Sequence, residues 1–139
     1  MDPTAEPAPA PRTPNRIPPQ HGLAVSAGLV AFSAWAGAAG LVLGFLDLGA
    51  EATNRLPFDS PVLGGIALIM TVAVPMTVVA IMAWRGDPRT GPVTVLAGIL
   101  QVWWIIVELA FIRIVSFFHP IYLAIGVAFI VAGRRTPRP

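Results

Sequence analysis

The chain has 139 residues, of which 55% are hydrophobic and only 12% are charged, about half the charged share of a soluble globular protein. The absence of cysteine excludes disulfides, thiol redox chemistry and thiolate metal sites, and two histidines are too few for a multi-histidine metal site. No basic cluster with interleaved aromatic residues is present in the sequence. We therefore expect no metal, no cofactor and no nucleic-acid partner. All nine basic residues are arginine, and together with the abundant Ala, Gly, Pro and Val this indicates GC-rich coding and a bacterial source.

Four long runs without Asp, Glu, Lys or Arg dominate the chain. They are 25, 25, 18 and 20 residues long and cover residues 22–46, 60–84, 90–107 and 114–133. Each run can cross a hydrocarbon layer about 30 Å thick, and none has the charged stripe of a soluble amphipathic helix. The sequence therefore predicts an all-α membrane protein with a bundle of four transmembrane helices. We expect a transmembrane domain over 22–134, with its helices at about 23–46, 61–84, 91–113 and 117–133.

The two tails differ from this domain in composition. Residues 1–20 contain seven prolines and little apolar mass, so we expect residues 1–21 to form a disordered tail, with a second short tail at 135–139. Seven arginines lie on the tails and in the turn between the second and third helices, whereas only Arg55 and Arg113 lie on the other side. The positive-inside rule then predicts that both termini are cytoplasmic in a multi-pass protein of the bacterial plasma membrane.

Small residues and one proline mark the first two predicted helices. Ala36, Gly40 and Gly44 recur every four residues on one face of the first helix. Small side chains let a neighbouring backbone approach, so we expect this face to pack on the third or the fourth helix, with homodimerisation as the alternative. Pro75 lies near the middle of the second helix, where it leaves the Thr71 carbonyl without its donor, and we expect a kink there.

Polar side chains in the last two helices form the candidate site. Gln101 lies near mid-membrane and should face other helices, because an unpaired amide is costly in lipid. Glu108 is the one acidic residue inside a predicted transmembrane helix. We expect its carboxylate to face the bundle interior and to bond His119 or Tyr122, ranked ahead of Arg113. A structural hydrogen bond and a proton or ion site both stay open for it.

The stretch Gln101–Glu108 and the stretch Phe111–Pro120 together form a recognisable pattern. Its positions are Trp104, Val107, Glu108, Ser116, Phe117, His119 and Pro120. This pattern resembles the C-terminal hairpin of small four-helix bacterial integral membrane proteins of unknown function, of an actinobacterial type. The resemblance implies the four-helix fold and brings no assigned activity. In those proteins Gln often stands at the position of Glu108, which weakens an obligatory proton role.

Three functions fit these features. The first, which we prefer, is a non-catalytic accessory or structural subunit, with the bilayer and other membrane subunits, or further copies of the chain, as partners. The second is a small homo-oligomeric transporter or ion-conducting protein that uses Glu108 and Gln101. The third is a membrane enzyme acting on a lipid or quinone, with Glu108 and His119 as an acid–base pair. We assign no catalytic residue, because the sequence holds no nucleophile–base pair, metal motif or phosphate loop.

Overall fold

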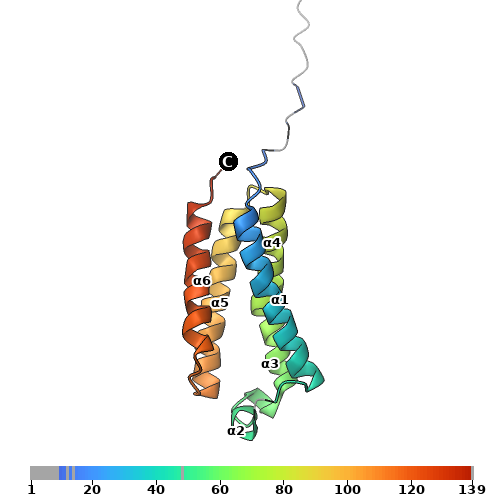
Figure 1. Cartoon of the computed structure of the whole chain (residues 1–139), viewed down its shortest axis with the longest axis vertical. Helices are drawn as coiled ribbons and strands as arrows, with labels where there is room; N and C mark the ends of the chain where they lie inside the picture. Colours follow the sequence, from blue (N-terminus) through green and yellow to red (C-terminus); the bar gives the residue numbers. More distant parts are fainter. Residues whose placement is uncertain (1–9, 12, 14, 48, 139) are drawn as a thin grey trace, which may run out of the picture.

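The computed structural model describes residues 10–11, 13, 15–47 and 49–138, and every regular element within these ranges is helical (Figure 1). The prediction of an all-α protein is therefore confirmed. The first long helix is α1 (His21–Leu43). The second is α3 (Pro61–Leu68), which continues through a π-helical turn (Ile69–Ala73) into α4 (Val74–Arg85). The third and fourth are α5 (Thr90–Ile112) and α6 (Phe118–Arg135). The connection from α1 to α3 contains the short helix α2 (Ala50–Thr53) and a 3-10 turn (Pro57–Asp59).

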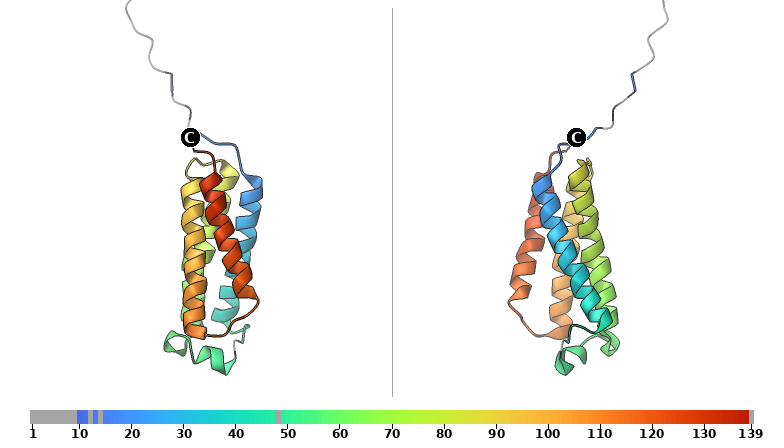
Figure 2. Two further views of the ribbon diagram at one scale, coloured as in Figure 1. Left: turned by 90° about the vertical axis from the view of Figure 1, so that its left-hand side faces the viewer. Right: turned by 45° about the vertical axis from the view of Figure 1, so that its right-hand side comes forward.

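The long helices form two antiparallel hairpins. In one, α1 lies beside the continuous α3–α4 helix, and in the other, α5 lies beside α6 (Figures 1 and 2). The described parts of both chain ends lie at the same end of the bundle as the α4–α5 turn, and α2 lies at the opposite end. Three helices are long and apolar enough to cross a membrane, namely His21–Leu43, Pro61–Arg85 and Thr90–Ile112.

The buried face of α1 is a ladder of alanines. Its members, spaced three or four residues apart, are Ala24, Ala27, Ala31, Ala34 and Ala38. The ladder packs on α3 and α4, and a methyl group on Gly65 of α3 would lie only 3.1 Å from the Ala38 carbonyl oxygen. Small residues on both helices bring the backbones together, which is how helices gain contact in a membrane.

The predicted packing face of α1 differs from the observed one. Ala36 is exposed, and Gly44 ends the helix in the left-handed conformation at φ 77°. Gly40 is buried, but it is covered by Leu46, whose N–H donates to the Gly40 carbonyl oxygen at 3.0 Å. The turn at Gly44 folds this leucine back over Gly40, so no helix needs to cover it. The neighbour of α1 is the second long helix, not the third or the fourth.

The irregularity expected at Pro75 takes the form of a π-helical turn just before it. The N–H of Val74 donates to the carbonyl of Ile69, five residues back, rather than to the usual residue four back. This wider turn accommodates a proline that cannot donate to Thr71. The helix therefore continues through Pro75 into α4.

Glycines at seven-residue spacing hold α5 against α6. A methyl group on Gly98 would lie 2.7 Å from the Gly126 carbonyl oxygen, and one on Gly133 would lie 2.7 Å from the Gly91 carbonyl oxygen. The two backbones therefore touch at these levels. The next positions in this series are not glycines: Ile105 lies seven residues after Gly98, and His119 lies seven residues before Gly126. From there the helices separate toward residues 113–117 (Figure 2).

The end of the predicted disordered tail is attached to the bundle. Ile17 is only 8% exposed, and its N–H donates to the Gly86 carbonyl oxygen at 3.0 Å, while the Gln20 N–H donates to Ala83 at 2.9 Å. The predicted disorder does not extend to these residues, because their amides find partners at the α4–α5 turn. Residues 1–9, 12 and 14 of the predicted tail lie outside the described residues.

Candidate functional site

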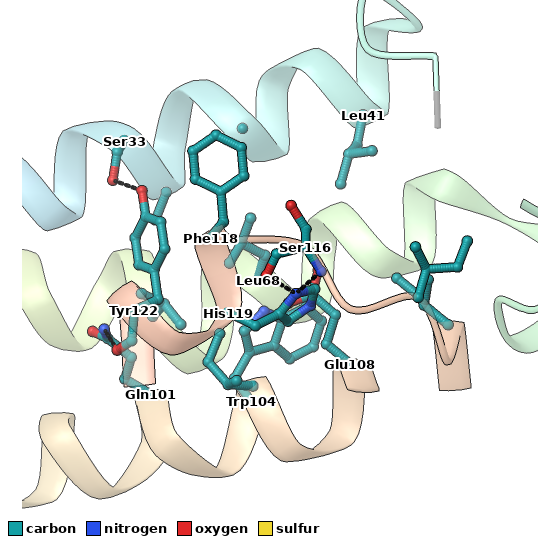
Figure 3. A pocket seen from close by; sticks show the side chains of 16 residues that line it. Ser33, Leu41, Leu68, Gln101, Trp104, Glu108, Ser116, Phe118, His119 and Tyr122 are labelled. Atoms are coloured by element: carbon teal, nitrogen blue, oxygen red, sulfur yellow. Dashed lines mark hydrogen bonds between the residues drawn. The ribbon is translucent and has the colours of Figure 1, made fainter. Parts of the chain in front are cut away.

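A cavity of about 450 Å³ lies between the two hairpins, in the half of the bundle near residues 113–117 (Figure 3). It exists because α1 packs on α3–α4 and α6 packs on α5, which leaves the α1–α6 seam loosely filled. Most of its wall is apolar. Its polar or titratable lining residues are Ser33 from α1, Gln101 and Glu108 from α5, Ser116 from the α5–α6 connection, and His119 and Tyr122 from α6.

Gln101 is 1% exposed, and its amide bridges the two helices of the second hairpin. Its Nε2 donates to the Tyr122 carbonyl oxygen at 2.8 Å. That carbonyl can only accept, so the amide orientation is determined by its partner. Its Oε1 is buried and has no hydrogen-bond partner among the described residues. Gln101 therefore faces other helices, as expected, and its Oε1 atom accepts no hydrogen bond from the described residues.

Tyr122 connects the two hairpins across the cavity. Its hydroxyl donates to Ser33 Oγ at 3.4 Å, and Ser33 donates in turn to the Val30 carbonyl oxygen at 2.8 Å (Figure 3). The Tyr122 hydroxyl is thus bonded to Ser33, and the Ser33 hydroxyl is bonded to the backbone. Neither is paired with a histidine or a carboxylate that would activate it as a nucleophile.

His119 lies in the first turn of α6, and its ring bonds the backbone that leads into the helix. The Ser116 N–H donates to His119 Nδ1 at 3.0 Å, and the Ser116 carbonyl oxygen lies 3.2 Å from the same nitrogen. When Nδ1 accepts the Ser116 N–H, the ring is neutral and its proton is on Nε2. This interaction positions the ring on the cavity wall beside the connection.

Glu108 is half-buried and lines the cavity from α5, so its side chain faces the bundle interior as expected. Within the described residues the expected bond to His119, Tyr122 or Arg113 is absent: His119 bonds Ser116 through Nδ1, and the Tyr122 hydroxyl bonds Ser33. Arg113 follows the end of α5 at φ 54° and is exposed. Within the described residues, the Glu108 carboxylate forms no ion pair or side-chain hydrogen bond.

A second cavity of about 270 Å³ adjoins the first on the side of α3. Both cavities are lined by Leu41, Trp104, Glu108 and Ile112. The first lies at the seam of α1 and α6, and the second at the seam of α3 and α5. Glu108 therefore stands where the two cavities meet, in the middle of this half of the bundle.

The open end of this region is tied together by Arg55. Its Nη1 donates to the carbonyl oxygen of Ile112, the last residue of α5, at 2.9 Å, and its Nη2 lies 2.7 Å from Glu51 Oε1. A cation bonded to the last carbonyls of a helix stabilises that terminus. The guanidinium is thus committed to the helix end and does not pair with Glu108.

Sequence reasoning found most of the polar members of this site and one of its aromatic members, Tyr122. It did not predict that Trp104 lines both cavities, or that Phe118 and Gly37 line the larger one. Ser33 and Gln101 lie at the same membrane depth in the predicted helices, and both are on the wall of the larger cavity. Comparison of the chain with protein-family models, curated proteins and solved structures found no match.

Proposed function

We propose that this chain is a non-catalytic integral membrane protein of the bacterial plasma membrane that binds a membrane-soluble amphiphile between its two helical hairpins. An amphiphile is proposed because the cavity is mostly apolar and lies among helices that can span a membrane. The observation that carries the proposal is the pairing of this apolar volume with the Glu108 carboxylate, which lines it and forms no ion pair within the described residues.

The energetic argument concerns the Glu108 carboxylate. An acidic side chain at the centre of a bilayer costs about 2.5–3.5 kcal/mol, and Glu108, four residues before the end of α5 at Ile112, costs less than that. A ligand whose head donates hydrogen bonds to the carboxylate offsets part of this cost, while its apolar body fills the remaining volume. Covalent catalysis is not proposed for Ser33 or Tyr122, because the Tyr122 hydroxyl donates to Ser33 and the Ser33 hydroxyl donates to the Val30 carbonyl oxygen.

Four membrane spans, with both termini in the cytoplasm, complete the proposal. α6 has 18 residues and is about 27 Å long, and it lies beside α5. Its polar ends, with His119 near one and Arg134 and Arg135 at the other, account for its lower apolar content. Large exposed apolar side chains such as Phe32 and Met70 are expected where lipid covers the helices.

The topology can be tested by single-cysteine labelling, because the natural chain has no cysteine. Cysteine is placed singly at Thr13, Asn54 and Arg138, all of which are exposed. With an impermeant thiol reagent on spheroplasts, only the Asn54 position should label. Labelling at Thr13 or Arg138 would contradict the proposed orientation.

The binding function can be tested by filling the cavity. Gly37 lines it from α1, and a methyl group there would meet Leu68 at an ordinary 3.6 Å. Gly37→Leu should therefore occupy the volume without moving a backbone. Gly28→Leu is the matched control on the same helix, because a methyl group on Gly28 meets nothing within 4 Å.

The readout is native mass spectrometry of the full chain purified in mild detergent, followed by extraction of any bound amphiphile. The parent and Gly28→Leu should both carry one, and Gly37→Leu should have lost it while unfolding at an unchanged temperature. Equal retention by Gly37→Leu, or a parent with nothing bound above the detergent background, would refute the proposed function.

A further inference from the structure

Among the residues that the structure describes, Glu108 is the only Asp, Glu or Arg side chain on the walls of the two adjoining cavities. The remaining lining residues are apolar, glycine, or neutral polar, apart from the ring of His119. A single carboxylate thus determines the charge of an otherwise uncharged volume. Opposite charge on an occupant would be favoured there, because interactions between charges are weakly screened away from water.

The nearby cations of the chain are committed elsewhere. Arg55 bonds the Glu51 carboxylate and the Ile112 carbonyl oxygen at the end of α5. Arg113, the residue after α5, is exposed. The His119 ring accepts the Ser116 N–H, and in that state it is neutral. Within the part of the chain that the structure describes, Glu108 forms no ion pair, and His119 is the one basic side chain that shares its cavity.

Aromatic rings surround the same volume. Trp104 lies against both cavities from α5, and Phe118 and Tyr122 line the larger one from α6 (Figure 3). The faces of aromatic rings attract cations, and Trp does so most strongly. A carboxylate in a cavity that aromatic side chains also line is a suitable environment for an organic ammonium group.

We infer that the occupant is a cation, a lipophilic amine whose protonated head lies beside Glu108 and whose apolar body fills the cavities between the hairpins. The inference rests on the proposed amphiphile-binding function and specifies the chemical class of the ligand. The N–H groups of such a head can donate to the carboxylate. A neutral alcohol of the same length supplies the apolar body and one donor, but no charge.

The test compares decylamine with decanol, which have the same chain length and differ in the charge of the head. Tritiated probes are titrated into nanodiscs that hold the full chain, at a pH where the amine is protonated. Partition into the lipid is subtracted with discs that hold no protein, and Gly37→Leu, whose added side chain narrows the cavity, gives the baseline for binding at this site. The parent should bind decylamine more tightly than decanol by about 10- to 100-fold, as expected for a hydrogen bond to a charged group.

Glu108→Gln keeps the shape of the side chain and removes its charge. It should lower the affinity for decylamine by about 10- to 100-fold and leave that for decanol within about threefold. Thermal unfolding of the variant shows whether it is folded, and the amine-over-alcohol preference of the parent tests the inference without any variant.

The outcomes separate the two proposals. If decanol binds above the Gly37→Leu baseline and decylamine binds no better, the cationic ligand is refuted while amphiphile binding stands. An unchanged decylamine affinity in folded Glu108→Gln also refutes the role of the carboxylate. If neither probe binds above the baseline, the proposed binding function itself fails.

Discussion

Gly98 is a position where one added methyl group should damage the contact between α5 and α6. Its Cβ would lie 2.7 Å from the Gly126 carbonyl oxygen and 2.9 Å from the Ile130 nitrogen. Both are backbone atoms of α6, so neither can rotate away, and α5 and α6 must move apart. Overpacking of this kind costs about 1–3 kcal/mol, and losing a close Cα–H···O contact adds about 0.5–1 kcal/mol. Alanine regains about 1 kcal/mol through its better helix propensity. The expected net loss for Gly98→Ala is therefore about 0.5–3 kcal/mol.

The assay is unfolding in mixed detergent micelles, followed by circular dichroism while the denaturing detergent is increased. Gly28→Ala is the matched control, because it makes the same substitution within a long apolar helix where the new methyl group has open space. The control should be neutral or slightly stabilising. If Gly98→Ala is as stable as Gly28→Ala, the two helices do not touch at this level and the glycine-mediated contact is refuted.

Three further substitutions test the ends of the helices in the same assay. Gly40→Ala should cost less than about 1 kcal/mol, because the new methyl group meets side-chain atoms of Leu46, which can shift, and no backbone atom of another helix, and a loss as large as that of Gly98→Ala would contradict this packing. Arg55→Ala should cost about 0.3–1 kcal/mol by removing the cation that bonds the Ile112 carbonyl oxygen, and an unchanged stability would show that this bond contributes nothing. Arg113→Gly should stabilise by about 1 kcal/mol, because glycine adopts φ 54° without strain, and Arg113→Ala, which keeps the strain, should not.

Much of the helical architecture could be read from the sequence, because local composition controls it. A run of 18 or more residues without charge must satisfy its backbone within one helix if it is to cross a bilayer. The observed long helices fall close to the four predicted ranges, with α5 at Thr90–Ile112 against a prediction of 91–113. Pro75 likewise marked a real irregularity, although the sequence did not indicate that a π-helical turn would absorb it.

The candidate site was only partly predictable, because polar residues inside apolar runs are conspicuous but their partners are not. Gln101 and Glu108 were recognised because an amide and an acid are rare at such depth. The partner of Gln101 is a backbone carbonyl, at Tyr122, and no sequence pattern identifies a carbonyl as an acceptor. Glu108 was expected to find His119, but a backbone amide three residues earlier in the chain holds that ring.

Helix pairing depended on contacts that the periodicity of a single helix does not reveal. In α1, the alanine ladder and the Ala36–Gly40–Gly44 series both recur at helical spacing, so the pattern alone does not say which face is buried. The alanine face is the buried one because Gly65, far away in the sequence, has no side chain and lets the backbone at Ala38 approach closely. The sequence by itself thus determined where the long helices lie, because that depends on the local cost of placing charge in lipid. Only the tertiary structure decided which faces meet and where a cavity is left, because both depend on the fit between side chains from distant parts of the chain.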